Sequence, residues 1–488
     1  MASLEEIRDE RIRKLNFLKE KGIDPYPART KRDYFLNEVI EKFTELSDGR
    51  EIFLVGRVMS LRGQGAIIFF NFFDGTAEFQ GLLKKGETQD EDFQLFGEVV
   101  DIGDFIEVKG TLFVTKRGEK TIQVKNWKML SKSLRPLPGE YYGLKDEEER
   151  LRKRYLDILV NKDVREMAIK RSKFWTSIRN FLLKRDFMEV ETPALENTAG
   201  GADARPFITH HNALDMDVYL RISAGELWQK RLMVAGFPKV FEIGRIFRNE
   251  GMDAEHLQDY TQMEFYSAYS DYNEGMEMVK DMYRYIAKET FDTLKFNIKG
   301  FEVDLEKDWE TYDYVSIIKE KTGIDIFNSN LAEMESKLRE LKVEYDSKGF
   351  NEMRAIDNLW KYCRKQIAGP GFLINVPVFM EPLAKRKEGD NKVVERFQVI
   401  LAGSEVGKGF SELNDPIDQA GRFEEQAKLR EGGDEEAQMY DHDFVEALEY
   451  GMPPTCGFGL SERLFSFLMD KPARECQIFP LMRPENKA

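Results

Sequence analysis

The chain has 488 residues, about three domains' worth, so it can bury a large core without disulfides or metals. It carries 73 Lys and Arg against 88 Asp and Glu, a formal net charge of −15, and 42% of its residues are hydrophobic. This composition excludes wholesale disorder, and no run of about 18 apolar residues predicts a membrane span. Three cysteines without a CxxC pair, and only four histidines, disfavour a disulfide framework and a Cys/His zinc site. The charged N-terminus lacks the apolar core of a signal peptide, so we expect a cytoplasmic protein.

Residues 1–46 are predicted to form a helical extension. They are dense in charge, and Ile7, Ile12, Leu15 and Leu18 recur near helical spacing, which predicts one or two surface helices. Two readings stay open: a solvated extension, or a helix that helps to grip RNA.

Residues 47–133 contain five short β-rich stretches separated by turns. In chain order these are EIFLVGRVMSL, AIIFFNFFDG, AEFQGLL, DFIEVKGTLFV and KTIQVKNWKML. Five strands of this length fit a small barrel of the oligonucleotide-binding (OB) kind. In the second stretch Phe69 and Phe73 share one face, which Phe70 and Phe72 cannot share, so at least one aromatic side chain should point outward. For Phe69, stacking on an unpaired base and plain core packing both remain open.

Residues 134–161 are predicted to be a linker, because two prolines and a glycine interrupt the chain before charge accumulates. A larger domain should then occupy residues 162–488. It begins with helical spacing of apolar residues up to Phe187, and a short strand ended by Pro193 follows.

The segment 240–269 is predicted to form two antiparallel strands, Val240–Phe247 and Thr261–Tyr269, joined by a polar loop. Charged residues stand where buried strands would carry apolar ones: Arg248, Glu250 and Glu264. An arginine at a strand end can hold a phosphate or carboxylate by two hydrogen bonds. A structural Arg–Glu pair within the hairpin is the alternative.

The segment 404–423 places Glu405 and Glu412 seven residues apart. If the chain turns at Gly407 or Gly409, the two carboxylates can converge, and such oxygen ligands suit Mg²⁺ bound to nucleotide phosphates. Two solvated surface acids are the alternative.

The segment 453–468 is predicted to be a glycine-rich turn that enters an amphipathic helix, with Ser461 as the N-cap. Arg463 would lie in the first helical turn, where a cation opposes the helix dipole, so its placement favours a role in anion binding. The chain has no GxxxxGK[ST] and no GxGxxG loop, so any ATP must be held by another scaffold.

Together these segments resemble the three signature motifs of class II aminoacyl-tRNA synthetases. The predicted order of domains, a barrel ahead of the catalytic domain, is similar to that of the synthetases for lysine, aspartate and asparagine. Within this subgroup the chain most closely resembles the lysyl-tRNA synthetases. The segments that carry this closer resemblance are LRPLP (134–138), RYLD (154–157), GGADARPFITHHNALD (200–215), PLAKR (382–386), FSELNDPIDQ (410–419), GDEEA (433–437) and ALEYGMPPT (447–455).

The resemblance implies an α+β fold: a five-stranded OB barrel followed by a catalytic domain built on an antiparallel sheet with flanking helices. It also implies a homodimer with the FMEVETP region (187–193) at its interface. The substrates would be ATP, with Mg²⁺ as cofactor, L-lysine and tRNA(Lys). Lysine would first react with ATP to give lysyl-adenylate and pyrophosphate, and would then pass to the 3′ end of the tRNA. Such chemistry rests on positioning and charge stabilisation.

The resemblance also assigns roles to single residues. Arg248 and Arg463 would be the catalytic arginines, and they would bind ATP together with Glu250, His256, Tyr260 and Glu405. Lysine would be bound by Gly201, Glu226, Arg248, Glu264, Tyr266, Phe410 and Glu412. Glu405 and Glu412 would carry Mg²⁺, and the barrel residues Phe69, Gln80 and Glu119 would read the anticodon.

Several positions depart from the pattern of the family. Lys408 stands in place of an asparagine and Glu255 in place of an arginine, the third motif is one residue shorter, and RISAGELW is one residue longer before Glu226. Two other functions stay in play. An aspartyl-type synthetase would need a cation in its pocket and an asparaginyl-type one neutral groups. Lys408 is the one residue that hints at this function, whereas Glu264 and Glu412 disfavour it. A non-catalytic RNA-binding paralogue is disfavoured by the presence of both arginines.

Overall fold

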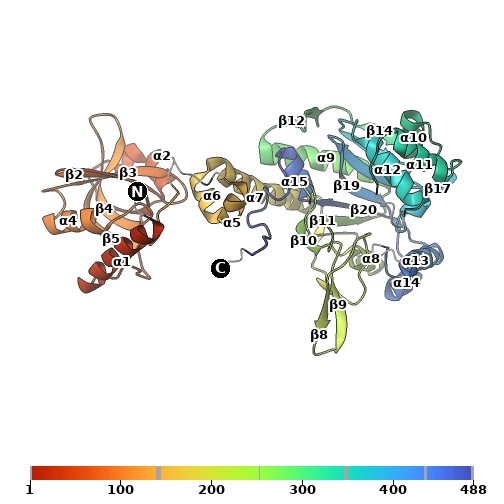
Figure 1. Ribbon diagram of the computed structural model, residues 1–488, viewed down its shortest axis with the longest axis horizontal. Helices are drawn as coiled ribbons and strands as arrows, with labels where there is room; N and C mark the ends of the chain where they lie inside the picture. The colour runs from red at the N-terminus through yellow and green to blue at the C-terminus, as the bar shows by residue number, and fades with distance from the viewer. Residues whose placement is uncertain are drawn as a thin grey trace. The chain divides into compact units, whose positions relative to one another are not determined.

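The computed structural model describes residues 3–138, 144, 146–251, 253–345, 350–432 and 437–484. The chain packs as two compact units, Met1–Arg150 and Leu151–Ala488, which Figure 1 shows. Within the described ranges, no helix is both long enough and apolar enough to cross a membrane.

The first unit is a closed barrel with strand order β1-β2-β3-β5-β4, as the five β-rich stretches predict. The strands are β1 (Ile52–Gln64), β2 (Ile67–Phe73), β3 (Glu78–Lys84), β4 (Phe105–Val114) and β5 (Lys120–Ser131). Its helices are α1 (Leu4–Glu20), α2 (Leu36–Glu41), α3 (Phe43–Leu46) and α4 (Asp90–Val99). Helix α4 lies outside the five predicted strands, and it packs Phe96 into the barrel core.

Strand β2 alternates strictly between the inside and outside of the barrel. Phe70 and Phe72 are buried, whereas Phe69 and Phe73 are half-buried on the outer face, so the expectation of an outward aromatic side chain is confirmed. The helices of the N-terminal extension are not detached from the barrel, because Leu18, Leu36 and Phe43 belong to its hydrophobic core.

The second unit is built on an eight-stranded sheet with the order β14-β15-β18-β19-β20-β11-β10-β6. The six inner strands pair antiparallel, but β6 pairs with β10, and β14 with β15, in parallel. The sheet is therefore antiparallel through its centre, as expected, and has one parallel pair at each edge. The edge strands β6 and β14 are only two and four residues long. Long connections lead from each of them to its neighbour, which lets the two strands of each edge pair run in the same direction.

The sheet strands are β6 (Met188–Glu189), β10 (Lys239–Phe247), β11 (Asp259–Ala268), β14 (Glu310–Asp313), β15 (Gly371–Ile374), β18 (Arg396–Leu401), β19 (Ser404–Ser411) and β20 (Thr455–Ser461). Smaller sheets contain β7 (Leu195–Glu196), β8 (Ile208–His211), β9 (Met216–Leu220), β12 (Lys295–Ile298), β13 (Phe301–Asp304), β16 (Arg386–Lys387) and β17 (Asp390–Val394). The helices from residue 147 onward are α5 (Glu147–Arg152), α6 (Arg154–Val160), α7 (Lys162–Leu183), α8 (Glu226–Val234), α9 (Tyr272–Phe291), α10 (Tyr314–Thr322), α11 (Leu331–Glu340), α12 (Glu352–Arg364), α13 (Pro416–Glu431), α14 (His442–Glu449) and α15 (Arg463–Leu468), with a 3₁₀ turn at Val378–Met380.

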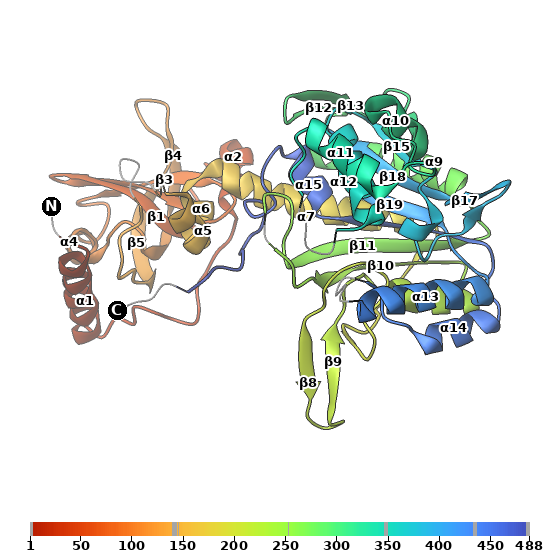
Figure 2. The ribbon, with the colours of Figure 1, turned by 45° about the vertical axis from the view of Figure 1, so that its right-hand side comes forward.

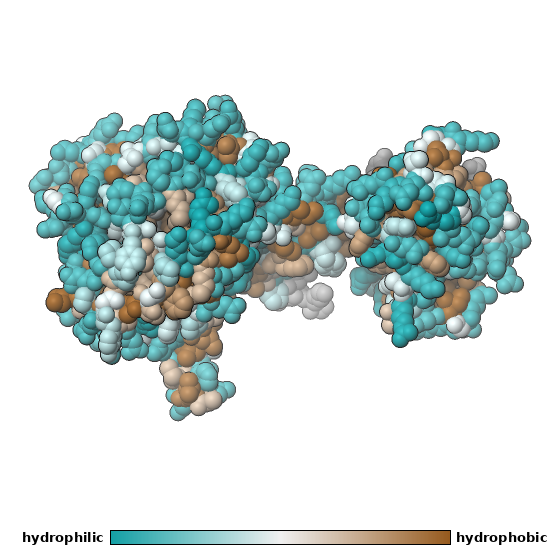
Figure 3. Space-filling view, turned by 180° about the vertical axis from the view of Figure 1, so that it is seen from behind, coloured by the Kyte–Doolittle hydropathy of each residue, from teal (hydrophilic) through white to brown (hydrophobic). Residues whose placement is uncertain are grey.

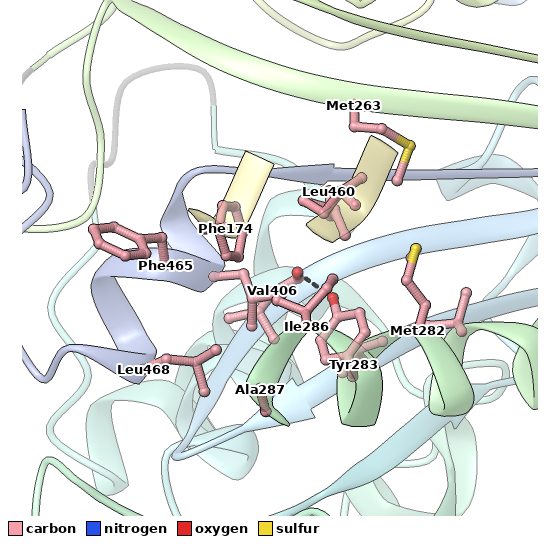
Figure 4. Close-up of a cluster of buried hydrophobic side chains, with 14 of the residues drawn as sticks. Phe174, Met263, Met282, Tyr283, Ile286, Ala287, Val406, Leu460, Phe465 and Leu468 are labelled. Carbon is pink, nitrogen blue, oxygen red and sulfur yellow. Dashed lines mark hydrogen bonds between the residues drawn. The ribbon is translucent and has the colours of Figure 1, made fainter. Parts of the chain in front are cut away.

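The two faces of this sheet differ in chemistry. On β11, Met263 and Phe265 point into an apolar core shared with α7, α9 and α15. Figure 4 shows this core, where the Tyr283 hydroxyl of α9 donates to the Val406 carbonyl of β19 at 2.6 Å. The alternate residues of β11 face the other side, where polar groups line a cavity and Tyr266 also packs into a second apolar core with Val240 and Phe410.

The β8–β9 hairpin projects from the second unit (Figure 2). Its apolar side chains Ile208 and Leu214 are exposed, and Figure 3 shows hydrophobic side chains gathered on this projection.

Candidate active site

The polar face of the sheet brings together residues that lie far apart in the sequence. Register pairs Glu264 of β11 with Gly459 of β20, and Gly459 with Lys408 of β19. One step along, Tyr266 pairs with Gly457, and Gly457 with Phe410. The glycines of the central strand leave room above it, so the side chains of the two neighbouring strands face one cavity of about 510 Å³.

Eleven of the twelve residues assigned to ATP or lysine line this one cavity. They are Gly201, Glu226, Arg248, His256, Tyr260, Glu264, Tyr266, Glu405, Phe410, Glu412 and Arg463. Glu250 is the residue that does not line it: its side chain is exposed, and its carbonyl accepts a hydrogen bond from Gln258 at 3.0 Å.

One region of the cavity wall is acidic. Glu226 is the first residue of α8, and Gln262 and Tyr266 flank Glu264 on the same face of β11. Glu264 accepts hydrogen bonds from the Gln262 amide at 2.6 Å, the Ala224 backbone at 2.9 Å and the Tyr266 hydroxyl at 3.0 Å. Burial, reinforced by repulsion from Glu226, raises the pKa of Glu264 above its ordinary value.

Glu412 is the third carboxylate of this acidic region. Its side chain is buried, and Oε1 accepts no hydrogen bond from any described residue. A Cβ at position 457 would lie 2.1 Å from this Oε1, so the carboxylate occupies space that only glycine leaves open. Burial raises the pKa of Glu412, although the ammonium of Lys230 opposes the shift. A buried oxygen without a donor is suited to receive an ammonium group.

Lys230 forms salt bridges with Glu412 and Glu226, which line the cavity, but is not itself one of the described lining residues. Its Nζ lies 2.8 Å from Glu226 Oε1 and 2.5 Å from Glu412 Oε2. Burial alone would lower the pKa of Lys230, but the two carboxylates raise it above its ordinary value. Sequence reasoning missed this residue, although its position four residues after Glu226 in a helix is the spacing of a facing ion pair.

The cavity also presents two arginines. Arg248 donates from Nε to the Ile222 carbonyl at 3.2 Å, and its guanidinium lies 5.8 Å from the centre of the Tyr260 ring. Among the described residues it forms no salt bridge, so its terminal nitrogens remain suited to an anion. Arg463, by contrast, forms a salt bridge with Glu255, which also pairs with Lys299.

Glu405 lies among cations. It accepts a hydrogen bond from Trp360 at 2.5 Å, and Arg364 and Arg396 lower its pKa against the effect of burial. The described residues contain no group of three or more His, Cys, Asp or Glu that could hold a metal. Glu405 and Glu412 both line the cavity, but one Glu412 oxygen is engaged by Lys230. This donor set fits a Mg²⁺ ion that gains its remaining ligands from phosphates and water.

Two expectations about the segment 453–468 are wrong in detail. Gly457 and Gly459 lie inside strand β20 and not in a turn, because the strand must pass close under the Glu412 and Glu264 side chains. The N-cap of α15 is Glu462 and not Ser461, although the Ser461 hydroxyl accepts from the Arg463 backbone at 3.3 Å. Arg463 begins the helix, as expected.

Lys408, one of the departures from the family pattern, lies 3.4 Å from Glu381. Lys408 lines the cavity, but its side chain is thus directed to Glu381, which is not one of the described lining residues. The GDEEA segment lies outside the described residues at 433–436.

The three barrel residues belong to one part of the barrel surface. Asn71 of β2 pairs with Gln80 of β3, which places Gln80 on the same outer face as Phe69, two residues before Asn71. Gln80 accepts a hydrogen bond from Thr121 of β5 at 2.8 Å, and Glu119 is exposed two residues before Thr121. This surface is distinct from the cavity, which is formed by the second unit alone.

Comparisons with known proteins assign a family to each of the two units. Residues 146–483 match the family of tRNA synthetases class II (D, K and N), and residues 52–130 match the OB-fold nucleic acid binding domain. The chain is similar to the lysine–tRNA ligase of Thermotoga maritima, at 43% identity over 99% of this chain and 97% of that protein. It is also similar to lysine–tRNA ligases of a Roseiflexus species, at 42% identity over 99% and 100%, and of a Thermoanaerobacter species, at 43% over 99% and 97%.

Proposed function

The chain belongs to the class II tRNA synthetases of the D, K and N group, and we propose that it is a lysine–tRNA ligase. In the first step the carboxylate of L-lysine attacks the α-phosphorus of ATP, and pyrophosphate leaves. In the second step the terminal ribose hydroxyl of tRNA(Lys) attacks the lysyl carbonyl, and AMP leaves.

The acidic region of the cavity determines the selectivity for lysine as the amino-acid substrate. A lysine side chain ends in an ammonium with three donors, and Glu412 Oε1 and the Tyr266 hydroxyl lie at the wall of the same cavity. An aspartate side chain would meet repulsion from Glu264 and Glu412, and its binding would leave the buried Glu412 oxygen without a donor. The pocket therefore favours lysine over aspartate or asparagine.

The two arginines support the adenylation step. Arg248 would bind the lysine carboxylate and the α-phosphate together, because no described residue forms a salt bridge with its guanidinium. Arg463 would bind the γ-phosphate after exchanging its contact with Glu255, and Tyr260 would stack against the adenine. The residues act by holding the reactants in line and by stabilising charge, without a protein nucleophile.

The residues present fit Mg²⁺ as a partner of ATP. Glu405 would hold it directly, while Glu412, whose Oε2 contacts Lys230 and whose Oε1 is assigned to the lysine ammonium, would contribute its negative charge from the same cavity. When bound, Mg²⁺ neutralises part of the charge of the triphosphate.

The barrel would bind the anticodon of the tRNA. Phe69 would stack on the central uridine, with Gln80 and Glu119 beside it; their shared outer surface supports this reading. We also propose the division into an extension (1–46), a barrel (47–133), a linker (134–161) and a catalytic domain (162–488).

We further propose a homodimer that acts in the cytoplasm. The FMEVETP region contains β6, a two-residue edge strand whose Met188 is exposed, which leaves this edge open to a second copy. Three buried free cysteines are consistent with a reducing compartment. The molar mass in solution tests the dimer.

The decisive experiment is amino-acid-dependent exchange of pyrophosphate into ATP, with purified protein, Mg²⁺ and each standard amino acid in turn. Exchange with lysine alone is expected. Exchange with aspartate or asparagine would overturn the assignment of the pocket and leave the reaction type standing. Absence of exchange with every amino acid would favour the RNA-binding paralogue.

A further inference from the structure

Lys230 is the one described residue that joins two carboxylates of the lysine pocket without lining the cavity itself. Its side chain is 1% exposed, and its Nζ lies within 6.0 Å of the ring centres of Tyr266, Phe410 and Phe444. An ammonium so deeply buried is costly unless its partners compensate it, so its two carboxylates must stay in place.

The charges of the pocket support a role beyond stability. Glu226, Glu264 and Glu412 are the three carboxylates of the acidic region of the cavity, whereas a lysine substrate brings only two ammonium groups. The carboxylate of the substrate is matched separately by Arg248. Lys230 supplies a further cation, which lies in direct contact with Glu226 and Glu412.

The geometry adds a constraint on distance. Glu226 belongs to α8 and Glu412 follows β19, so they lie on different elements of the fold. A single ammonium in contact with both carboxylates, at 2.8 Å and 2.5 Å, fixes their spacing. We assign the α-amino group of the substrate to Glu226, which lines the cavity next to Gly201, and the side-chain ammonium to Glu412. The spacing of these carboxylates therefore determines how long a diamino acid must be to place one ammonium group on each of them.

We infer that Lys230 is a positioning residue that sets the distance between the two ammonium subsites and so selects lysine over shorter diamino acids. This inference rests on the proposed lysine activation. Lys230 itself touches neither substrate nor ATP; it acts through Glu226 and Glu412.

The test compares two substitutions. Lys230→Met has a similar length but no charge, whereas Lys230→Arg keeps the positive charge and can still donate to both carboxylates. Arg231→Met is the matched control, since Arg231 follows on the same helix but pairs with Asp441 at 3.0 Å and does not line the cavity. For each variant, pyrophosphate exchange gives KM and kcat for lysine, ornithine and ATP, and circular dichroism reports folding.

Lys230→Met is expected to raise the KM for lysine at least about tenfold, while the KM for ATP stays within about twofold. The preference for lysine over ornithine, which is one methylene shorter, should shrink, and Lys230→Arg should recover part of it. If Lys230→Met does not fold, a changed preference in the folded Lys230→Arg supports the inference, and an unchanged preference overturns it.

Equal effects on the KM of lysine and of ATP, or an unchanged preference in every folded variant, would overturn the inference alone. Absence of lysine-dependent exchange in the unaltered protein would overturn the proposed function and this inference together.

Discussion

The carboxylate of Glu255 forms a salt bridge with the guanidinium of Arg463, and both residues line the same cavity. Glu255 belongs to the loop between β10 and β11, whereas Arg463 begins α15. Lys299, in the turn between β12 and β13, pairs with the same carboxylate. Although burial opposes it, Arg463 and Lys299 lower the pKa of Glu255, so this carboxylate is ionised at neutral pH. The arginine assigned to the γ-phosphate therefore already has an anionic partner.

Glu255→Gln is expected to tighten the binding of ATP. The substitution removes an anion that competes with the triphosphate for Arg463, and a partly buried pair of this kind contributes on the order of 1 kcal/mol. The KM for ATP in lysine-dependent exchange should fall about threefold to fivefold, with kcat little changed.

Asp259→Asn is the control for this substitution. Asp259 follows the same loop and pairs with Arg245 at 2.5 Å, but neither residue lines the cavity. A lower KM for ATP in both variants would point to general charge and not to competition for Arg463. A higher KM in Glu255→Gln would show instead that Glu255 orients Arg463 for the nucleotide.

Arg248→Gln is expected to abolish most of the exchange activity without loss of the fold. Two charge-assisted hydrogen bonds to the reactants contribute on the order of 3 kcal/mol, so kcat/KM should fall at least about 100-fold. The melting temperature should stay nearly constant, because Arg248 forms no salt bridge among the described residues. Arg221→Gln is the contrast: it breaks a buried pair with Glu242 and should lower the melting temperature.

The strand pattern of the sequence was sufficient to predict the framework of the site. The antiparallel hairpin of β10 and β11 lies within two residues of its predicted bounds, because period-2 alternation and a polar loop are local signals. The alternation of Phe69, Phe70 and Phe72 in the barrel was readable for the same reason.

What the sequence could not provide is pairing across the fold. The contact of Lys230 with Glu412 joins residues 182 positions apart, and nothing local to either one indicates the other. The same holds for Glu255 and Arg463, 208 positions apart. The glycines of β20 predict a turn, because glycine is typical of turns. In the fold they instead leave space for the Glu412 carboxylate and the Tyr266 ring. The parallel edge strands are too short to carry a period of their own.

Gly457→Ala is expected to destabilise the second unit and to weaken lysine binding. The new methyl group would lie 2.1 Å from Glu412 Oε1 and 2.6 Å from the Tyr266 ring, so a buried carboxylate must move. We expect a loss of about 2–3 kcal/mol in the free energy of unfolding and a higher KM for lysine. Urea unfolding and exchange kinetics measure the two effects.

Gly421→Ala provides the control for the glycine prediction. Gly421 lies in α13, and a Cβ there would meet no atom within 4 Å. Alanine should stabilise the helix by about 0.5–1 kcal/mol and leave the KM for lysine unchanged. Equal stability of both variants would contradict the close packing of β20 against Glu412.

Glu196 is expected to make stability depend on pH. Burial raises its pKa from 4.5 to about 7, even though Trp228 donates to its Oε1 at 2.9 Å. Between pH 4.5 and pH 7 the unfolded chain loses this proton while the folded protein keeps it, so stability falls as pH rises through this window.

The shift of Glu196 corresponds to at most about 3 kcal/mol. Glu196→Gln keeps the size of the side chain and cannot ionise, so the stability of the variant relative to the unaltered protein should rise between pH 5 and pH 8. Urea unfolding at both pH values measures the difference. An identical pH dependence in the two proteins would show that Glu196 titrates near its ordinary pKa.

Phe69→Ala is expected to separate the two steps of the reaction. Phe69 is half-buried on the outer face of the barrel, and the loss of one stacked base costs about 1–3 kcal/mol. The KM for tRNA(Lys) in aminoacylation should rise at least about fivefold, whereas lysine-dependent exchange, which needs no tRNA, should be unchanged. Phe72→Ala removes a fully buried ring from the same strand and should instead lower the stability of the barrel by about 3–5 kcal/mol. If Phe69→Ala leaves the KM for tRNA unchanged, the outer face of β2 does not bind the anticodon.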